Sequence, residues 1–303
     1  TQTLQGWYPY NMSFKSGFVS IIGRPNTGKS TLLNAVLGEK ISIVSDKPQT
    51  TRNTIRGVKN LKDCQIIFLD TPGIHRAKGL LNEFMLKQAM SALSNIDCIV
   101  YLVEANRPVT GDDRLIIESL KKVNAPVILA VNKIDMVKKH ELLPLMDEYS
   151  RLFAFREIIL VSALKGDGIE TLLESVKALL PIGPEYFPED AATDQPVRFI
   201  AAEIIREKIF IHTHEEVPYS SAIVIEEYKE KNGLVSISAA INVERDSQKG
   251  IIIGKKGSML KKIGTEARKD IEALVDARVY LSLFVKVSPE WTRSRTALKE
   301  FGY

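Results

Sequence analysis

The sequence contains only two cysteines, Cys64 and Cys98, which are too few and too far apart for a disulfide framework or a zinc cluster. We therefore expect a reduced, cytoplasmic setting. Long hydrophobic runs are also missing: no uninterrupted apolar stretch approaches ~18 residues, so a membrane-spanning helix is not expected. The first residues lack the basic and apolar segments of a secretory signal. What is present, 45% hydrophobic and 26% charged residues, is typical of a globular protein.

The net charge of +4 excludes little by itself, but the charge is unevenly distributed. Residues 249–269 carry seven lysines and arginines and a single acidic residue, Glu266. Such a cluster is typical of a surface that contacts nucleic-acid phosphates. The alternative is a solvated helix face, which is the usual meaning of a run of charges.

Between residues 17 and 180, apolar runs alternate with amphipathic segments. The apolar runs predict strands at 18–22, 65–69, 98–103, 126–131 and 157–161. The amphipathic segments predict helices at 29–38, 79–94, 112–123, 141–150 and 168–180. Strands alternating with helices favour an α/β domain, whose mostly parallel sheet has helices on both faces.

The pattern changes after residue 180. Residues 181–196 contain four prolines and Gly183, which is typical of a semi-rigid linker. The following residues predict a small α+β domain, with helices at 197–213 and 258–273 and strands at 219–228, 234–244 and 278–287. We therefore divide the chain into an N-terminal extension (1–16), an α/β domain (17–180), a linker (181–196) and an α+β domain with a C-terminal tail (197–303). Residues 1–11 are expected to lie outside the α/β domain, and Met12 is a candidate for the natural start.

The octapeptide GRPNTGKS at 23–30 fits the phosphate-binding pattern G-x-x-x-x-G-K-[ST] and lies between a predicted strand and a predicted helix. Backbone N–H groups of such a loop point at phosphate. Lys29 would reach the β- and γ-phosphates, and Ser30 would ligate Mg²⁺. A chance match, the alternative, is expected in about 1 in 100 chains of this length. The expected phosphate-binding residues are Gly23, Asn26, Thr27, Gly28, Lys29, Ser30 and Thr31.

Two further segments complete a predicted triphosphate site. Asp70-Thr71-Pro72-Gly73 ends an apolar run, where Asp70 can hold Mg²⁺ through water and the Gly73 N–H can approach the γ-phosphate. In the loop at 45–52, a threonine can close over Mg²⁺ and the γ-phosphate. Thr51 is favoured and Thr50 is the alternative; an ordinary polar surface loop is also possible. The expected magnesium ligands are Ser30, Thr51 and, through water, Asp70.

The N-K-x-D sequence at 132–135 predicts which base is bound. An Asp135 carboxylate would accept hydrogen bonds from guanine N1–H and N2–H₂, which adenine cannot offer. The Lys133 stem can cover the base and Asn132 can brace the phosphate loop. Ser162-Ala163-Leu164 would bring the Ala163 N–H to guanine O6. The alternative is a polar turn at a strand end. We therefore expect GTP and GDP as ligands.

Ile74 follows Gly73 at the position where Ras-like switches carry a glutamine that orients water. Isoleucine cannot hydrogen-bond water, so a slow intrinsic hydrolysis by other groups is expected. The side-chain carbonyl of Asn26 is a candidate K⁺ ligand, and the cation would neutralise charge as an arginine finger does. The alternative is that Asn26 only shapes the loop.

Gly254-Lys255-Lys256-Gly257 follows three isoleucines and precedes a predicted helix, as in the G-x-x-G loop of KH modules. The glycines would let single-stranded RNA approach, and an apolar groove beside them would hold about four bases, with Ile263 as a further lining residue. A glycine-rich turn with solvated lysines is the alternative. The expected RNA-binding residues are Ile252, Ile253, Gly254, Lys255, Lys256, Gly257, Lys261, Lys262 and Arg268.

Together these motifs resemble the Era family of GTPases over residues 14–303. The resemblance rests on GRPNTGKS, TTR at 50–52, DTPG, NKID, SAL, FPED at 187–190, EIIREK at 203–208 and the stretch 254–270. It implies a P-loop GTPase domain followed by a type II KH domain. It also implies binding near the 3′ end of 16S rRNA, a role in assembling the 30S ribosomal subunit, and at most a peripheral association with the inner membrane. We expect a monomer that does not bind DNA.

The linker and the two predicted ligand sites lead us to the hypothesis of a switch mechanism. GTP and Mg²⁺ would order residues 40–53, here named the switch loop, and residues 71–79, and this ordering would change how the two domains meet. Bound RNA would in turn favour hydrolysis. The alternative is an RNA-binding structural protein whose nucleotide site no longer cycles. Ile74 favours that alternative, whereas the intact Lys29, Ser30, Asp70 and Asp135 oppose it.

Overall fold

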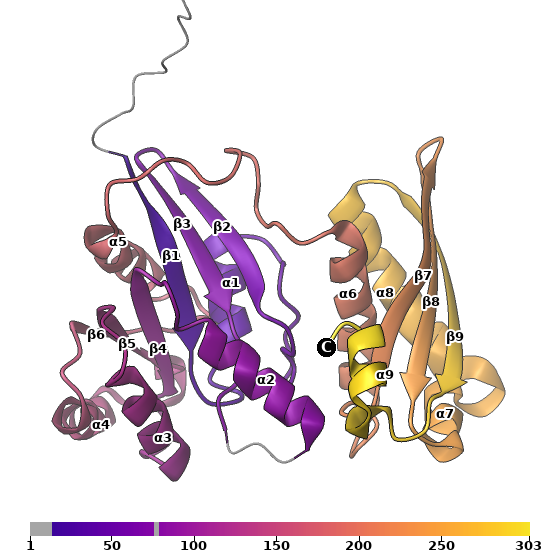
Figure 1. Cartoon of the computed structure of the whole chain (residues 1–303), viewed down its shortest axis with the longest axis horizontal. Helices are drawn as coiled ribbons and strands as arrows, with labels where there is room; N and C mark the ends of the chain where they lie inside the picture. Colours follow the sequence, from indigo (N-terminus) through magenta and orange to yellow (C-terminus); the bar gives the residue numbers. More distant parts are fainter. Residues whose placement is uncertain (1–13, 76–78) are drawn as a thin grey trace, which may run out of the picture.

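The computed structural model describes residues 14–75 and 79–303, which form two domains side by side (Figure 1). The N-terminal residues 1–13, and residues 76–78 of the predicted second switch segment, lie outside the described residues. The first domain has a six-stranded sheet in the order β2-β3-β1-β4-β5-β6, in which only the β2–β3 pair is antiparallel. Its strands are β1 (Lys15–Ile22), β2 (Ile55–Leu61), β3 (Cys64–Asp70), β4 (Cys98–Glu104), β5 (Val127–Asn132) and β6 (Glu157–Leu160).

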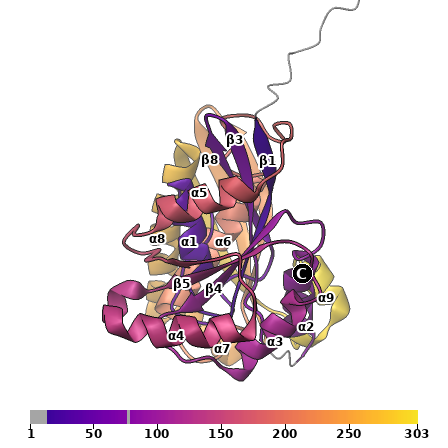
Figure 2. The same ribbon diagram turned by 90° about the vertical axis from the view of Figure 1, so that its left-hand side faces the viewer.

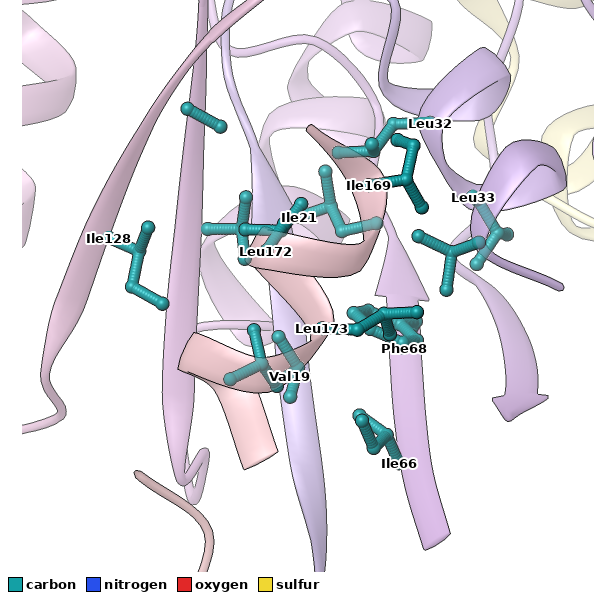
Figure 3. Close-up of a cluster of buried hydrophobic side chains, with 14 of the residues drawn as sticks. Val19, Ile21, Leu32, Leu33, Ile66, Phe68, Ile128, Ile169, Leu172 and Leu173 are labelled. Carbon is teal, nitrogen blue, oxygen red and sulfur yellow. The ribbon is translucent and has the colours of Figure 1, made fainter. Parts of the chain in front are cut away.

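Helices cover both faces of this sheet, as the alternation of apolar and amphipathic segments predicts. On one face, α1 and α5 pack against residues such as Val19, Ile21 and Phe68 (Figure 3). On the other face lie α2, α3 and α4. Every residue of β4 is buried, because the strand is covered on both sides. The helices are α1 (Lys29–Leu37), α2 (Leu80–Ser91), α3 (Gly111–Leu120), α4 (Lys139–Leu152) and α5 (Ile169–Leu179), with a 3₁₀ turn η1 (Ile134–Met136).

The second domain is a three-stranded sheet in the order β7-β8-β9 with helices packed on one face. The β7–β8 hairpin turns at Asn232 and Gly233, as predicted, and β9 runs parallel to β8. Its elements are α6 (Val197–His212), β7 (Ala222–Lys231), β8 (Leu234–Val243), α7 (Asp246–Ile253), η2 (Lys255–Gly257), α8 (Ser258–Val275), β9 (Arg278–Val287), η3 (Trp291–Arg293) and α9 (Arg295–Glu300). Within the described part of the chain, no helix is both long and apolar enough to cross a membrane.

Three elements differ from the sequence-based expectation. The edge strand β2 was not predicted, because its polar residues hide the alternation. The apolar run at 251–253 is the last turn of α7; this helix begins at Asp246, and the Gln248 side chain accepts the backbone N–H groups of Glu244 (2.9 Å) and Arg245 (3.1 Å). The C-terminal tail forms η3 and α9, which lie beside α2 in Figures 1 and 2.

The linker is fastened to the edge of the first sheet. The fully buried Gln65 side chain accepts the N–H groups of Tyr186 (2.7 Å) and Phe187 (3.0 Å), and it donates to the Phe187 carbonyl (2.8 Å). Further along, the Val58 N–H donates to the Ala192 carbonyl (2.8 Å). The linker therefore follows the surface of the first domain before it enters α6.

We predict that Gln65→Leu lowers the free energy of unfolding by about 1–3 kcal/mol, because two part-buried N–H groups of the linker lose their acceptor. Urea denaturation measures the change. The matched control is Gln195→Leu, whose partly exposed amide donates to the neighbouring Asp194 (3.1 Å). That control should stay within about 0.5 kcal/mol of the parent. Equal effects of the two substitutions would contradict the role given to Gln65.

Candidate functional site

The phosphate loop connects β1 to α1 and depends on close backbone approaches. Gly28 has a φ of 95°, and a Cβ at this position would lie 2.4 Å from Asn132 Nδ2. A Cβ on Gly73 would lie 2.6 Å from the backbone N of Pro25. Glycine at these two positions therefore allows the 132–135 segment and the 70–73 segment to reach the loop.

Lys29 is held inside the loop. Its Nζ donates to the carbonyls of Arg24 (2.8 Å) and Gly23 (3.2 Å), and the side chain is almost completely buried. Burial lowers the pKa of Lys29 to about 8, while the nearby carboxylates of Asp70 and Glu104 oppose this shift. An anion bound in the loop would favour the charged ammonium, so the site suits phosphate.

Three oxygen-bearing side chains meet beside Lys29. The Ser30 hydroxyl donates to Asp70 Oδ2 (2.7 Å) and lies 2.8 Å from Thr51 Oγ1, which is 3.5 Å from the same carboxylate oxygen. Burial raises the pKa of Asp70. Hydroxyl and carboxylate oxygens are the ligands that Mg²⁺ prefers, so these residues fit the ion.

Thr50, the alternative magnesium ligand, points elsewhere. Its hydroxyl donates to the Lys47 carbonyl (2.7 Å) within the switch loop. The geometry therefore favours Thr51. Among residues 14–75 and 79–303, there is no cluster of three or more His, Cys, Asp or Glu side chains that could hold a metal ion elsewhere.

A cavity opens over these groups. It is lined by the phosphate loop, the switch loop and Gly73, from residues Pro25, Asn26, Gly28, Lys29, Ser30, Thr31, Ile43, Val44, Ser45, Gln49, Thr50, Thr51 and Gly73. Two other predicted residues support the site from behind: Thr27 donates to the Arg24 carbonyl (3.0 Å), and Thr71 donates to the Ile21 carbonyl (2.8 Å).

Asn132 joins the segments predicted to bind guanine. Its Nδ2 donates to the Thr27 carbonyl (2.8 Å), and its Oδ1 accepts the Ala163 N–H (2.9 Å). Asp135 accepts a hydrogen bond of 2.5 Å from Ser162. The Ala163 N–H, which we expected at guanine O6, thus donates to Asn132 in this structure. Leu164 follows it with most of its side chain exposed.

Two carboxylates behind the loop were missed from the sequence. Glu104 contacts the Lys133 ammonium (2.5 Å), and Asp113 pairs with Arg24 (3.0 Å). Glu104 lies at the carboxyl end of the buried strand β4. The rule that parallel strands end at one edge could have placed it beside Asp70 and Asn132.

Ile74 and Asn26 have different surroundings in the structure. Ile74 is almost completely buried and packs in one apolar cluster with Ile22 and Tyr101, while its N–H donates to Gly23 (3.0 Å). Asn26 instead donates through Nδ2 to the Asp46 carbonyl of the switch loop (2.8 Å). The contact places a switch-loop carbonyl beside the phosphate loop.

A second candidate site lies on the C-terminal domain. The G-K-K-G loop at 254–257 joins α7 to α8. Gly254 has a φ of 70°, and a Cβ at this position would lie only 2.7 Å from Met259 Cβ. A groove of about 390 Å³ runs beside it between α8 and β9. Its lining residues are Gly257, Leu260, Lys261, Gly264, Thr265, Arg268, Leu281 and Leu283. Lys255, Lys256 and Lys262 are exposed nearby.

The apolar wall of this groove differs from the one predicted. Ile252 and Ile263 have no exposed surface and belong to the core of the domain, and Ile253 is partly buried against it. Because residues 251–253 are helical, the Ile252 side chain is packed inside the core of the domain. It cannot contact an RNA base unless the core unfolds. The apolar side chains that line the groove are Leu260, Leu281 and Leu283.

Comparison with known proteins gives matches to both domains. The family model described as 50S ribosome-binding GTPase matches residues 18–133, and the KH domain model matches residues 216–292. The curated GTPase Era of Geotalea uraniireducens is 60% identical over 291 residues, which cover 96% of this chain and 98% of that protein. GTPase Era of Syntrophus aciditrophicus is 54% identical, covering 97% and 96%.

Two solved structures are similar over nearly the whole chain. One is Era in complex with MgGDPNP and nucleotides 1506–1542 of 16S ribosomal RNA. The other is a variant of Aquifex aeolicus Era bound to GDP and AlF₄⁻. Each is 43% identical with a TM-score of 0.93, and each match covers 96% of this chain and 99% of the other.

We predict that Asp135→Asn lowers GTP affinity by about 100-fold, because an amide cannot accept both guanine donors with full charge. The same variant should bind xanthosine triphosphate, whose O2 accepts a hydrogen bond from the new amide. Titration of both nucleotides measures the change. The control is Asp147→Asn, an exposed carboxylate on α4 that pairs with Arg151 (2.6 Å). Unchanged GTP affinity in Asp135→Asn would contradict the predicted base contact.

Proposed function

The protein belongs to the Era family of GTPases, and we propose that its GTP cycle controls the binding of 16S rRNA, near the 3′ end, during assembly of the 30S ribosomal subunit. The contact between the switch loop and the C-terminal domain carries this proposal. Lys40 and the Val44 N–H contact Glu207 of α6 at 2.6 and 3.0 Å. A loop that responds to the triphosphate is thereby attached to the RNA-binding domain.

At the nucleotide, each of the predicted residues has one task. Bound Mg²⁺ would neutralise charge on the β- and γ-phosphates. Ser30 and Thr51 would ligate the ion, and Asp70 would hold one of its waters. Lys29 would contact the phosphates, and the Gly73 N–H would donate to the γ-phosphate. Asp135 would select guanine.

We propose a potassium ion as the remaining charge for hydrolysis. Ile74 is turned into the core and cannot orient water. Asn26 donates through Nδ2 to the Asp46 carbonyl, so an ion shared by Asn26 Oδ1 and that carbonyl would replace this hydrogen bond. Side-chain and backbone carbonyls are the ligands that replace the hydration shell of K⁺. They would hold the ion where negative charge develops on the phosphates.

Replacing K⁺ by Na⁺ is therefore expected to slow GTP turnover by about tenfold or more, and Asn26→Ala should remove this difference. Steady-state GTP hydrolysis in matched chloride salts measures both. Asn124→Ala, in the exposed loop between α3 and β5, is the control and should keep the cation dependence. Equal turnover of the parent protein in the two salts would exclude the potassium site.

RNA would bind along the groove beside the G-K-K-G loop. Lys255, Lys256, Lys261 and Arg268 would neutralise phosphates, while the three groove leucines would contact unstacked bases. This binding mode does not depend on the isoleucines that we first expected in the apolar wall, because Gly257, Lys261 and Arg268 still line the groove.

We predict that the double substitution Lys255→Asp and Lys256→Asp weakens binding of a 3′-terminal 16S rRNA oligonucleotide by about 100-fold. It should also make the slope of log affinity against log salt concentration shallower, by the amount that roughly two phosphate contacts contribute. Fluorescence anisotropy at several salt concentrations measures both. Lys229→Asp with Lys231→Asp, on the β7–β8 hairpin, is the matched control. A salt slope unchanged by the loop substitutions would contradict this assignment.

The coupling is tested by measuring the same RNA with the protein loaded with GDP or with GDPNP. Because coupling between two binding sites is reciprocal, tighter RNA binding in the GDPNP state requires tighter GDPNP binding in the presence of RNA. Equal RNA affinity in the two states would exclude the switch. We further propose a monomer that works in the cytoplasm, binds no DNA and has at most a peripheral contact with the inner membrane.

A further inference from the structure

Thr51 and Arg52 are neighbours in the switch loop but contact different domains. Thr51 Oγ1 lies 2.8 Å from Ser30 Oγ in the nucleotide site. The Arg52 guanidinium instead donates to backbone carbonyls of the C-terminal domain, those of Ser221 (2.8 Å), Tyr219 (2.8 Å) and Pro218 (3.2 Å). Because the two residues are adjacent, one short stretch of backbone makes both contacts.

The receptor for Arg52 is a closed pocket. The side chain is 1% exposed, and its guanidinium lies 5.8 Å from the centre of the Trp291 ring and 5.4 Å from that of Tyr303. The Tyr303 hydroxyl accepts a further hydrogen bond of 3.0 Å. The two rings stack on each other at 5.7 Å. Ring faces and carbonyl dipoles together suit a planar cation, which makes the pocket specific for arginine over lysine.

Helix α6 holds the rest of the switch loop in the same position. The Lys47 ammonium donates to the carbonyls of Phe210 and Thr213 at the C-terminal end of α6, where the helix dipole favours a cation. Arg206 donates to the Thr50 carbonyl. The C-terminal domain therefore contacts the switch loop on both sides of the residue that faces the metal site.

We propose that Arg52 is a positioning residue for GTP hydrolysis: seated in the C-terminal domain, it holds Thr51 at Ser30 and Asp70. The metal site of the first domain is then completed by the second domain, which acts as an activating partner within the same chain. The inference rests on the proposed function of Thr51 as a magnesium ligand. It adds that the Trp291–Tyr303 pocket holds the switch loop in the conformation that the nucleotide alone would otherwise have to stabilise.

The same pocket connects to the RNA groove and to helix α2, which follows the second switch segment in the chain. Trp291 follows β9, whose Leu281 and Leu283 line the groove. On the other side, Leu81 and Met85 of α2 belong to one buried cluster with Trp291. A displacement of β9 by bound RNA would therefore reach the Arg52 pocket through a short covalent path.

The test uses Arg52→Gln in the full chain, with GTP turnover measured against GTP and Mg²⁺ concentrations. We expect kcat to fall by about tenfold and the Mg²⁺ concentration for half-maximal rate to rise, with GDP affinity within about twofold of the parent. Arg52→Lys, which keeps the charge but not the planar fork, should give an intermediate loss. Arg56→Gln is the matched control, because its half-exposed guanidinium pairs with Asp194 of the linker (2.6 Å).

Tryptophan emission reports the pocket independently of turnover. The chain has two tryptophans, so a Trp7→Phe background leaves Trp291 as the only one. Its emission should differ between the GDP and GDPNP states in the parent, and Arg52→Gln should abolish the difference. A merely structural role of Arg52 would lower stability without removing this nucleotide response or changing the Mg²⁺ dependence.

Two results would overturn the inference. One is a parent-like kcat and Mg²⁺ dependence in Arg52→Gln when the Trp291 response is lost. The other is a Mg²⁺ defect in Arg52→Gln that Thr51→Ala does not share, which would show that Arg52 does not act through Thr51. That second result would remove the proposed metal role of Thr51 as well, whereas the first result leaves that role standing and overturns the inference alone. A Trp291→Leu variant with the Arg52→Gln defect would support the inference from the side of the C-terminal domain.

Discussion

The hydrogen bond between Ser30 and Asp70 joins the first turn of α1 to the end of β3, and the nucleotide site is organised around it. It can form because β1 and β3 are parallel neighbours, so that the loop after β1 and the end of β3 lie at one edge of the sheet. Glycine at position 73 removes the side chain that would keep the two segments apart. Thr51 then needs to supply only one more oxygen.

Most of this arrangement could be predicted from the sequence, because each motif is short and directly follows a strand. Parallel strands place their carboxyl ends together, so the order of the motifs already predicts one site. Glu104 could have been placed from its position at the carboxyl end of β4, whereas Asp113 was missed because it lies on α3 and only the tertiary fold brings it to Arg24. The choice between Thr50 and Thr51 likewise depends on backbone direction, which composition does not reveal.

The C-terminal domain was harder to predict in detail than in outline. Its loop glycines and lysines are recognisable, but which isoleucine faces the groove depends on whether 251–253 is strand or helix. Arg52 belongs to the TTR motif, but the sequence gives no sign that its side chain is buried, since an arginine in a polar loop is usually solvated. Its partners lie more than a hundred residues away in the chain, so a buried arginine becomes visible only once Ser221, Trp291 and Tyr303 are placed around it.

The way Gln65 and Val58 fasten the linker decides how far the domains can separate. With residues 186–194 attached to the first domain, the last two through Arg56, only Gln195 and Pro196 remain before α6, which corresponds to a reach of roughly 7 Å. The C-terminal domain is thus a hinged part rather than a domain on a long tether. Its effective concentration at the switch loop stays high even when every contact between the domains is broken, so the domains can re-engage rapidly without searching solution.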